Sequence, residues 1–411
     1  MFYAKMVIDS SHLVHQKNNQ YQQSTAMITL LKMIYQQYET RDNSPLLFAI
    51  NEYKAAVYQT IICNHQNTNL SQDKINKINK INYKNFSSLL QCDHIASFLD
   101  HPLYPTARAK LGFNTQDLYH YTTEFKAKFK LNWIAVPKAL STLSGTLPSF
   151  WPSFTDVGLN QSLQHRYTLL PVHPFLIQRL KSLLNSQEIE LPFIKAPRSF
   201  LTVKPTLSIR TVSITDHNNF HLKLPLDIRT LSTKNIRTIK ASTINDGHQV
   251  QSLLEYIRSQ DIELRNNISL TSEHTGMHVN SQPMLAFILR QYPEQLKNHW
   301  IIPIAALGAK NNGKLIIQHL VDDHFNKDIN QFLNSYFNLI IHTHLKLWLV
   351  YGVALEANQQ NSLLVINPTT KNLSLLFKDN DAPRINSKIL IKALPQSQDY
   401  LKKNHGSTYF N

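Results

Sequence analysis

The sequence predicts an α+β protein, because a region of strand patterns is followed by a long helical pattern and a β-hairpin. Residues 199–240 contain β-branched and apolar runs separated by turn formers, which is typical of an antiparallel sheet. The runs predicted as strands are 201–203, 206–214 and 220–226, with a turn at 216–219. Residues 328–350 repeat apolar side chains at helical spacing and predict a buried helix ending near Gly352, where glycine permits a left-handed residue.

Polar residues around the predicted hairpin are of the types that bind Mg²⁺. Apolar runs at 362–366 and 373–377 flank a turn-rich segment and predict the hairpin. Glu356 is followed five positions later by Asn361, and Asp379 follows the second run. Protein kinases hold Mg²⁺ with an amide five residues after an Asp and with a later Asp. The pattern indicates a metal site, and an ordinary polar loop before a hairpin is the alternative.

The elements before the sheet are less sharply marked. Residues 27–35 have the apolar repeat of a helix. Residues 45–50 and 55–63 fit either two strands or a strand and a helix, and the sequence does not separate these readings. Residues 129–136 predict a strand that ends at Pro137.

Composition limits the class of partner and the compartment. The chain has 411 residues, enough for two or three domains, and 42 Lys and Arg against 27 Asp and Glu, a net charge of +15. This charge favours anionic ligands such as nucleotides and carboxylates, and its even spread argues against a nucleic-acid-binding tail. Residues 331–350 are too polar to span a membrane, and the N-terminus lacks a signal-peptide core. With Cys63 and Cys92 as the only cysteines, we expect a cytoplasmic protein without disulfides.

Basic and hydroxyl side chains on the predicted sheet suggest a phosphate site. Ser208 and Arg210 are two residues apart and would share one face of a strand, whereas Thr211 would point to the other face unless a bulge intervenes. Lys223 lies on the next strand and Arg237 on the following segment. A hydroxyl, a guanidinium and an ammonium on one sheet can hold phosphate oxygens, although a solvated basic face is the simpler alternative.

A second basic loop precedes the sheet. Two prolines stiffen the segment HPLYPTARAKLGF at 101–113, which also carries Arg108 and Lys110. Cations beside a rigid turn can bind a carboxylate, and arginine can do so through two parallel hydrogen bonds.

An ordered set of motifs resembles one enzyme family. The motifs are HPLYPTARAKLGF, PVHP at 171–174, PTLSIRTV at 205–212, HLKLPL at 221–226, Arg237, PIAAL at 303–307, and GVALEANQQNSLL at 352–364 with Asp379 after it. The chain resembles the NRPS-independent siderophore synthetases of the aerobactin-synthetase (IucA/IucC) type, over roughly residues 98–390. An ordered set is far more specific than any single motif.

The resemblance implies a fold and an activity. The expected architecture is hand-like, with a thumb over 1–185, fingers carrying the antiparallel sheet over 186–310, and a kinase-like, FhuF-like helical palm over 311–411. Members of the family use ATP and Mg²⁺ to adenylate a carboxylate, commonly of citrate, and condense it with an amine or hydroxyl. The implied products are AMP, pyrophosphate and a siderophore amide or ester. The implied partners are these small molecules, with a homodimer or a second synthetase chain, and neither nucleic acid nor membrane.

The resemblance also assigns roles to residues. The residues implied around ATP are Ser208, Arg210, Thr211, Lys223, Glu356, Gln360, Asn361 and Asp379. The implied metal ligands are Glu356, Asn361 and Asp379. The residues implied for catalysis are Lys223, Arg237 and Asn358, and those implied for substrate binding are His101, Arg108 and Arg237.

Departures from the family pattern keep a second hypothesis open. Tyr104 and Asn358 stand where the family has histidine, and asparagine cannot carry a proton at neutral pH. Phe175 and Leu176 stand where the family tends to have tryptophan and glutamine. The chain also stops earlier than the family does, which predicts an incomplete palm. The alternative is therefore a truncated or degenerate homologue that keeps the fold, and nucleotide or carboxylate binding, without turnover.

Overall fold

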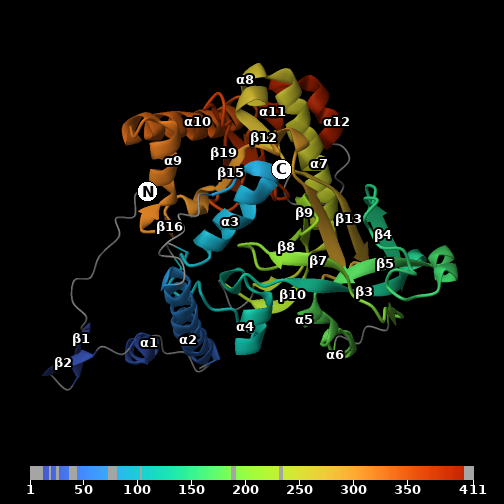
Figure 1. The fold of residues 1–411 in the computed structure, drawn as a ribbon, viewed down its shortest axis with the longest axis horizontal. Coiled ribbons are helices and arrows are strands. Elements are labelled where there is room, and N and C mark those ends of the chain that lie inside the picture. Colours follow the sequence, from blue (N-terminus) through green and yellow to red (C-terminus); the bar gives the residue numbers. More distant parts are fainter. Residues whose placement is uncertain are drawn as a thin grey trace. The chain divides into compact units, whose positions relative to one another are not determined.

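The computed structural model describes residues 13–17, 20–24, 27–36, 44–72, 81–101, 104–186, 191–230 and 235–401. The chain divides into two compact units, each considered by itself below. Unit 1 comprises Met1–Ile62, His101–Leu111 and Arg229–Asn235. Unit 2 comprises Cys63–Asp100, Gly112–Ile228 and Ile236–Asn411, and Figure 1 labels many of the elements of both.

Unit 1 contains a two-stranded antiparallel ladder and helical segments. Strand β1 (Leu13–Lys17) pairs with β2 (Gln20–Ser24), and α1 (Met27–Gln36) confirms the helix predicted at 27–35. Helix α2 (Ser44–Gln72) begins in this unit and includes both ambiguous segments, 45–50 and 55–63, so the prediction of a strand there was wrong. Short apolar runs fit either state, and only their continuity through 29 residues identifies the helix.

In unit 2, nine strands of the described residues form one antiparallel sheet, which confirms the predicted fold class. The order is β4-β13-β14-β9-β8-β7-β3-β5, and β6 also pairs with β3. The strands are β3 (Phe129–Pro137), β4 (Ser141–Ser144), β5 (Tyr167–Val172), β6 (Ile194–Lys195), β7 (Phe200–Pro205), β8 (Thr211–Ile214), β9 (His217–Lys223), β13 (Ser272–Val279) and β14 (Ala286–Gln291). A core of aliphatic and aromatic side chains packs against this sheet, including Leu131, Val203, Leu222 and Phe287. Strand β3 confirms the strand predicted at 129–136.

The segment 206–214 is not one strand, contrary to the prediction. Strand β7 ends at Pro205, a turn follows, and β8 begins at Thr211, whose N–H donates to the Ser208 carbonyl at 2.6 Å. Ser208 and Arg210 therefore lie in a turn and do not share a strand face. Alternating β-branched and polar residues imitate a strand here, while the turn is closed by backbone and threonine hydrogen bonds, including Thr206 Oγ1 to the Thr211 carbonyl at 2.8 Å.

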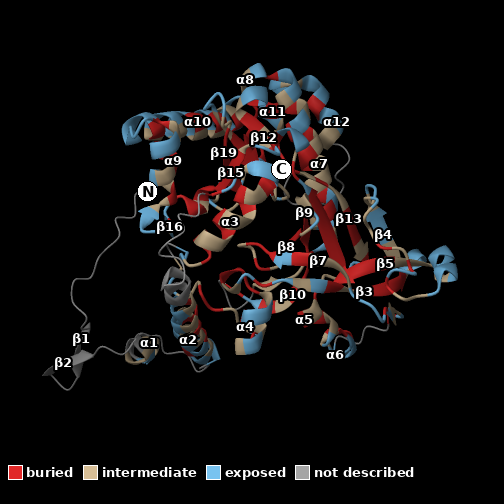
Figure 2. Cartoon of the chain, in the orientation of Figure 1, coloured by how far each residue is buried: buried red, intermediate tan, exposed pale blue. Residues whose placement is uncertain are grey.

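A second sheet of unit 2 contains the predicted hairpin. Its order is β12 (Ile268–Leu270), β20 (Leu373–Phe377), β19 (Ser362–Ile366) and β15 (Trp300–Pro303), with β12 parallel to β20 and the other pairs antiparallel. The hairpin has the bounds that the apolar runs predicted. All five residues of β19 are buried, as expected for a central strand that is covered on both faces. Figure 2 shows these strands as largely buried.

Helix α10 (Ile329–Leu349) lies in the predicted place but is buried on one face only. The Asp328 carboxylate caps its start by accepting the Gln331 N–H at 3.0 Å. Gly352 follows its end with φ +65°, and a Cβ there would lie 2.7 Å from the Asn386 carbonyl oxygen, so glycine is required. The buried residues are Phe332, Leu339, Thr343 and Leu347, whereas Phe337, Ile341, Leu345, Trp348 and Leu349 are exposed. The prediction that this helix is buried was therefore wrong for the face that carries the exposed residues. A pattern that is apolar all round does not reveal which face of a helix is covered.

The remaining elements connect and cover these sheets. The further α-helices are α3 (Ser87–Ala96), α4 (Thr115–Tyr121), α5 (Pro174–Ile177), α6 (Leu180–Ser186), α7 (Ala241–Gln260), α8 (Ile262–Asn267), α9 (Ile316–His324), α11 (Ser387–Ala393) and α12 (Gln398–Leu401). Short strand pairs are β10 (Leu226–Arg229) with β11 (Ile236–Arg237), β16 (Lys310–Asn311) with β17 (Lys314–Leu315), and β18 (Val353–Ala354) with β21 (Arg384–Ile385). No helix within the described ranges has the length and apolar character needed to cross a membrane. Cys63 and Cys92 are both buried, and neither forms a disulfide.

Candidate active site

A cluster of buried charges in unit 2 joins the nine-stranded sheet to the end of the hairpin. We call it the Asp379 cluster, and its members are Lys223, Glu273, Arg290, Asp379 and Asp381. Lys223 Nζ donates to Asp379 Oδ1 at 2.6 Å, although the two residues are 156 positions apart in the sequence. Two of the residues that the resemblance places around ATP therefore lie in direct contact.

Three neighbouring strands supply the cluster. Lys223 is the last residue of β9 and lies opposite Ile288 of β14, so Arg290 is its diagonal neighbour two residues further along β14. Glu273 lies in β13, which pairs with β14 on the other side and has an irregular register beside this residue. Asp379 lies two residues beyond the end of β20. The order of the strands thus brings a lysine, an arginine and a glutamate to one place.

The Asp379 carboxylate is held by two cations. Its Oδ2 lies 2.7 Å from Arg290 Nη2, and its Oδ1 accepts from Lys223. Burial alone would raise the pKa of Asp379, but the charges of Arg290 and Lys223 hold it well below its usual value. Asp379 is therefore an anion throughout the physiological pH range.

Two further guanidinium groups lie close to the cluster. Arg210 Nη1 donates to the Thr238 carbonyl at 2.5 Å. Burial lowers the pKa of Arg210, while Asp379 and Asp381 oppose this shift. Burial and the charge of Arg210 together lower the pKa of Arg237 to about 10. A partly buried guanidinium whose charge is disfavoured by a neighbouring arginine marks a place with a surplus of positive charge, which suits an anionic ligand.

Asp381 is a carboxylate that the sequence did not single out. Its Oδ2 lies 3.8 Å from Lys223 Nζ. Burial raises the pKa of Asp381 to about 6, Lys223 lowers it, and Asp379 and Glu273 raise it further. Because the folded-state pKa lies above the unfolded value, Asp381 contributes stability below about pH 4 that is lost as the pH rises through about 6.

An Asp381→Asn variant is expected to gain stability relative to the parent as the pH rises from 4 to 7. The amide resembles the protonated carboxyl and carries no buried charge, so the gain at pH 7 should be at most about 3 kcal/mol, from roughly two pKa units. The measurement is urea unfolding of both proteins at pH 4 and pH 7 in metal-free buffer. A stability difference that does not change with pH would show that Asp381 does not titrate in this range.

The loop before the hairpin closes on itself through Asn358. The side-chain oxygen of Asn358 accepts the backbone N–H groups of Gln360 at 3.0 Å and Asn361 at 2.8 Å. The backbone N–H of Asn358 donates to the Glu356 carbonyl at 2.9 Å. This side chain therefore organises the loop, and its proposed catalytic role stays a prediction. The Lys378 N–H donates to the Asn361 carbonyl at 3.1 Å, so Asn361 and Asp379 lie at the same end of the hairpin.

The residues predicted to bind Mg²⁺ have side chains of the chemical types that coordinate this ion. Carboxylate and amide oxygens are its usual protein ligands, and Asp379, Asp381 and Asn361 supply such groups at this end of the hairpin. Glu356 is exposed in the loop. Within the ranges that the structure describes, no group of three or more His, Cys, Asp or Glu is arranged to hold a metal. Both oxygens of Asp379 face cations, so a bound ion would compete with Lys223 or Arg290 for them.

The other predicted site residues divide between the two units. Thr211 is buried at the start of β8 opposite Lys223, and Ser208 lies in the preceding turn. His101 and Arg108 belong to unit 1, where the His101 Nδ1 accepts the Tyr104 N–H at 3.1 Å. Tyr104 also donates from its hydroxyl to Glu52 Oε1 at 3.1 Å. The substrate-binding roles of His101 and Arg108 stay predictions.

The structure adds charged residues that motif reading missed. Glu273 and Arg290 are buried in strands, and Lys378 and Asp93 are buried beside the cluster, where each acts on the pKa of the other. Burial lowers the pKa of Lys378 and raises that of Asp93. One signal was available in the sequence, since the run AFILRQ places an arginine after four apolar residues, and a charge in such a run needs a partner.

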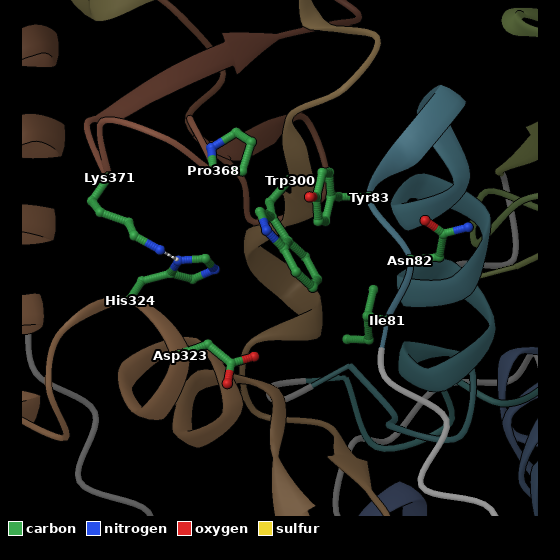
Figure 3. Close-up of a pocket in the computed structure, with 8 residues that line it drawn as sticks. All are labelled: Ile81, Asn82, Tyr83, Trp300, Asp323, His324, Pro368 and Lys371. Carbon is green, nitrogen blue, oxygen red and sulfur yellow. Dashed lines mark hydrogen bonds between the residues drawn. The ribbon is translucent and has the colours of Figure 1, made fainter.

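A cavity of about 420 Å³ lies at the opposite end of the hairpin from Asp379. Trp300 and Tyr83 form part of its wall, and Lys371 Nζ lies 2.9 Å from His324 Nδ1 at its edge (Figure 3). None of its lining residues belongs to the Asp379 cluster. The candidate chemistry therefore rests on the charge cluster and not on this cavity.

Comparison with known proteins identifies the family. The sequence model described as the IucA / IucC family matches residues 88–309, and one described as a ferric iron reductase FhuF-like transporter matches residues 330–408. Staphyloferrin A synthase of Staphylococcus aureus is 24% identical over 312 residues, which cover 71% of this chain and 52% of the relative. The chain spans about half the length of the curated relatives it matches.

Solved structures share the fold at low sequence identity. The petrobactin biosynthesis protein AsbB of Bacillus anthracis superposes with a TM-score of 0.73 at 19% identity, covering 97% of this chain and 68% of that one. ATP-bound aerobactin synthetase IucA of Klebsiella pneumoniae gives a TM-score of 0.71 at 17% identity, covering 94% and 71%. Because the family match covers more than half of the residues, the chain belongs to the IucA/IucC family.

Proposed function

We propose that the chain carries an ATP-dependent ligase activity of siderophore biosynthesis, which adenylates citrate or a related acid and condenses it with an amine or hydroxyl. Family membership supports the ligase class, and one relative of the same fold is described as ATP-bound. The observation that carries the proposal is the meeting of Lys223 with Asp379 beside two guanidiniums. Cations arranged in this way can bring a polyphosphate and a carboxylate together despite their like charges.

The reaction has two steps. In the first, a carboxylate oxygen attacks the α-phosphorus of ATP and forms an acyl adenylate, while pyrophosphate leaves with the electron pair of the broken P–O bond. In the second, the lone pair of an amine or hydroxyl attacks the acyl carbon, the nucleophile loses a proton and AMP leaves. The products are an amide or ester, AMP and pyrophosphate.

The residues of the chain have distinct parts in this proposal. Arg210 and Lys223 neutralise phosphate oxygens, and Arg237 orients the carboxylate that reacts. Ser208, Thr211 and Gln360 donate further hydrogen bonds to the nucleotide. Asp379 and Asn361, with Glu356, would hold Mg²⁺, which when bound supplies positive charge to the leaving pyrophosphate. Lys223 exchanges its bond to Asp379 for one to phosphate, which frees an Asp379 oxygen.

The hand-like architecture belongs to the same proposal. The strands of the nine-stranded sheet that lie within 186–310 would form the fingers, and the hairpin with α10 would form the kinase-like palm. A cytoplasmic location and a second synthetase subunit, identical or different, complete the proposed setting. The departures at Tyr104 and Asn358 then affect the choice of substrate and the rate.

The direct test is adenylation trapped with hydroxylamine. Purified protein is incubated with ATP, Mg²⁺ and one acid from a panel of citrate, 2-oxoglutarate and succinyl derivatives, and both hydroxamate and pyrophosphate are measured. We expect both products with one member of the panel. ATP binding without pyrophosphate for any acid would overturn the ligase and support the homologue without turnover.

An Arg210→Ala variant is expected to bind ATP tens of fold more weakly than the parent. Charge-assisted hydrogen bonds to phosphate are stronger than neutral ones, so their loss should reduce the binding free energy by on the order of 2 kcal/mol. The measurement is a calorimetric ATP titration, with a thermal melt of each protein. Arg198→Ala removes an exposed arginine and serves as the control. Equal ATP affinity in the parent and Arg210→Ala would remove the phosphate role.

A further inference from the structure

The backbone of Asp379 has a conformation that a non-glycine residue rarely adopts. Its φ is +56°, in the left-handed region. Such a conformation costs on the order of 1 kcal/mol and persists where the surrounding structure holds it. The residue also carries the carboxylate to which the proposed function assigns Mg²⁺. What fixes this backbone therefore bears on how that carboxylate is presented.

Glu273 bonds to the Asp379 backbone and to Arg290 at once. Its Oε1 accepts the Asp379 N–H at 3.2 Å and Arg290 Nε at 2.5 Å. Arg290 then reaches Asp379 Oδ2 with its Nη2 at 2.7 Å. The three residues form a closed ring of contacts, in which one side of Asp379 is fixed through both its main chain and its side chain.

The ring is rigid because its members are buried and anchored. The Arg290 side chain is 2% exposed and that of Glu273 is 10% exposed. The Glu273 N–H donates to Gln251 Oε1 at 2.8 Å, which ties the residue to helix α7. With Oδ2 held by Arg290, the remaining oxygen of Asp379 is Oδ1, which faces Lys223.

We propose that Glu273 and Arg290 are positioning residues, which fix Asp379 so that its Oδ1 is presented to the metal and phosphate side of the site. The pair does not touch substrate in this assignment. It acts through Asp379, by holding a left-handed backbone and by occupying Oδ2. This inference rests on the proposed function for the identity of the ligand, whereas the restraint on Asp379 is a property of the fold alone.

The restraint is tested first, without any ligand. Amide hydrogen exchange at Asp379 is measured by NMR in the parent, Glu273→Gln and Glu273→Met. Glutamine keeps an oxygen that can accept the Asp379 N–H, and methionine has a similar length without an acceptor. We expect exchange at Asp379 to accelerate at least tenfold in Glu273→Met and to stay near the parent rate in Glu273→Gln. The Lys378 amide, which bonds to the Asn361 carbonyl at 3.1 Å, is the internal reference.

The consequence for metal binding is tested second. Binding of Mn²⁺ in the presence of ATP is followed by electron paramagnetic resonance in the same three proteins. We expect Glu273→Met to weaken Mn²⁺ binding about tenfold or more and Glu273→Gln to restore it largely. Glu294→Met, which removes a carboxylate from an exposed ion pair, should match the parent. With any acid that is a substrate, Glu273→Met should lower kcat and raise the Mg²⁺ concentration needed for half-maximal activity. The KM for the acid should change little.

The outcomes separate this inference from the proposed function. If the parent with ATP binds no Mn²⁺, the proposed function loses its metal site, and the exchange data still decide the restraint. If Mn²⁺ binds equally in the parent and in Glu273→Met, the positioning role is overturned while the metal site stands. If Asp379 exchanges at the parent rate in Glu273→Met, Glu273 does not hold that backbone and the inference fails. If Glu273→Met does not fold, Glu273→Gln is compared with Asp379→Asn, which changes the ligand itself. A loss of Mn²⁺ binding in folded Glu273→Gln as large as that in Asp379→Asn would also overturn the positioning role, because the glutamine oxygen can still accept the Asp379 N–H.

Discussion

Arg290→Met is expected to reduce the free energy of unfolding by about 3–5 kcal/mol. Arg290 is 2% exposed and is the partner of both Glu273 and Asp379. Its removal takes the direct cation from Glu273 and leaves Lys223 as the only cation of the cluster, facing both Asp379 and Asp381. The penalty comes from these uncompensated charges, and not from the loss of a favourable pair, since a buried ion pair as a whole contributes little net stability.

The measurement for Arg290 is urea unfolding at pH 7, followed by circular dichroism and tryptophan fluorescence. Lys314→Met is the control, because Lys314 pairs with Asp322 at 3.0 Å on the surface and should change stability by less than about 1 kcal/mol. Combining Arg290→Met with Glu273→Gln should recover part of the loss, because it removes one of the stranded charges. A loss in Arg290→Met no larger than that of the control would show that the interior tolerates the free carboxylates.

The sequence predicts the hairpin well because two independent signals agree there. Continuous apolar runs identify two buried strands, and the turn formers between them set the connection, so the bounds 362–366 and 373–377 are correct. The length of the apolar pattern predicts the helix over 328–350 equally well. The pattern does not predict that one face of this helix is exposed, because Phe337, Ile341 and Trp348 give the same periodic signal whether or not anything covers them.

The failures lie where tertiary contacts override local preference. The segment 206–210 has the residue types of a strand and is a turn, because hydrogen bonds from Thr206 and Thr211 close it. The ambiguous segments 45–50 and 55–63 failed for another reason, since short apolar runs do not distinguish a strand from a helix. Motif spacing found Lys223 and Asp379 but not Glu273 or Arg290. Those two belong to no motif, and their importance arises from burial, which only the packed structure shows.

Lys223→Met is expected to lower the rate of pyrophosphate formation by about 100-fold or more, if the proposed ligase activity is present. Lys223 and Arg290 are the two cations of the sheet that contact Asp379, and Lys223 is the one we assign to exchange between that carboxylate and phosphate. Methionine keeps most of the side-chain volume and removes the charge. Without the ammonium, the charge that develops on the leaving pyrophosphate loses its stabilising partner in the sheet, whereas binding of the acid depends mainly on Arg237. We therefore expect the loss to fall mostly on kcat.

The rate is measured as pyrophosphate release at saturating ATP, with the acid that gives hydroxamate in the parent. Lys204→Met is the matched control, because Lys204 lies exposed on β7 of the same sheet and should leave the rate unchanged. A thermal melt of Lys223→Met checks the fold, because Asp379 keeps Arg290 as its partner and the protein should stay folded. A folded Lys223→Met protein with the parent rate would exclude Lys223 from phosphate neutralisation and would leave Arg210 and Arg237 as the cations of the reaction.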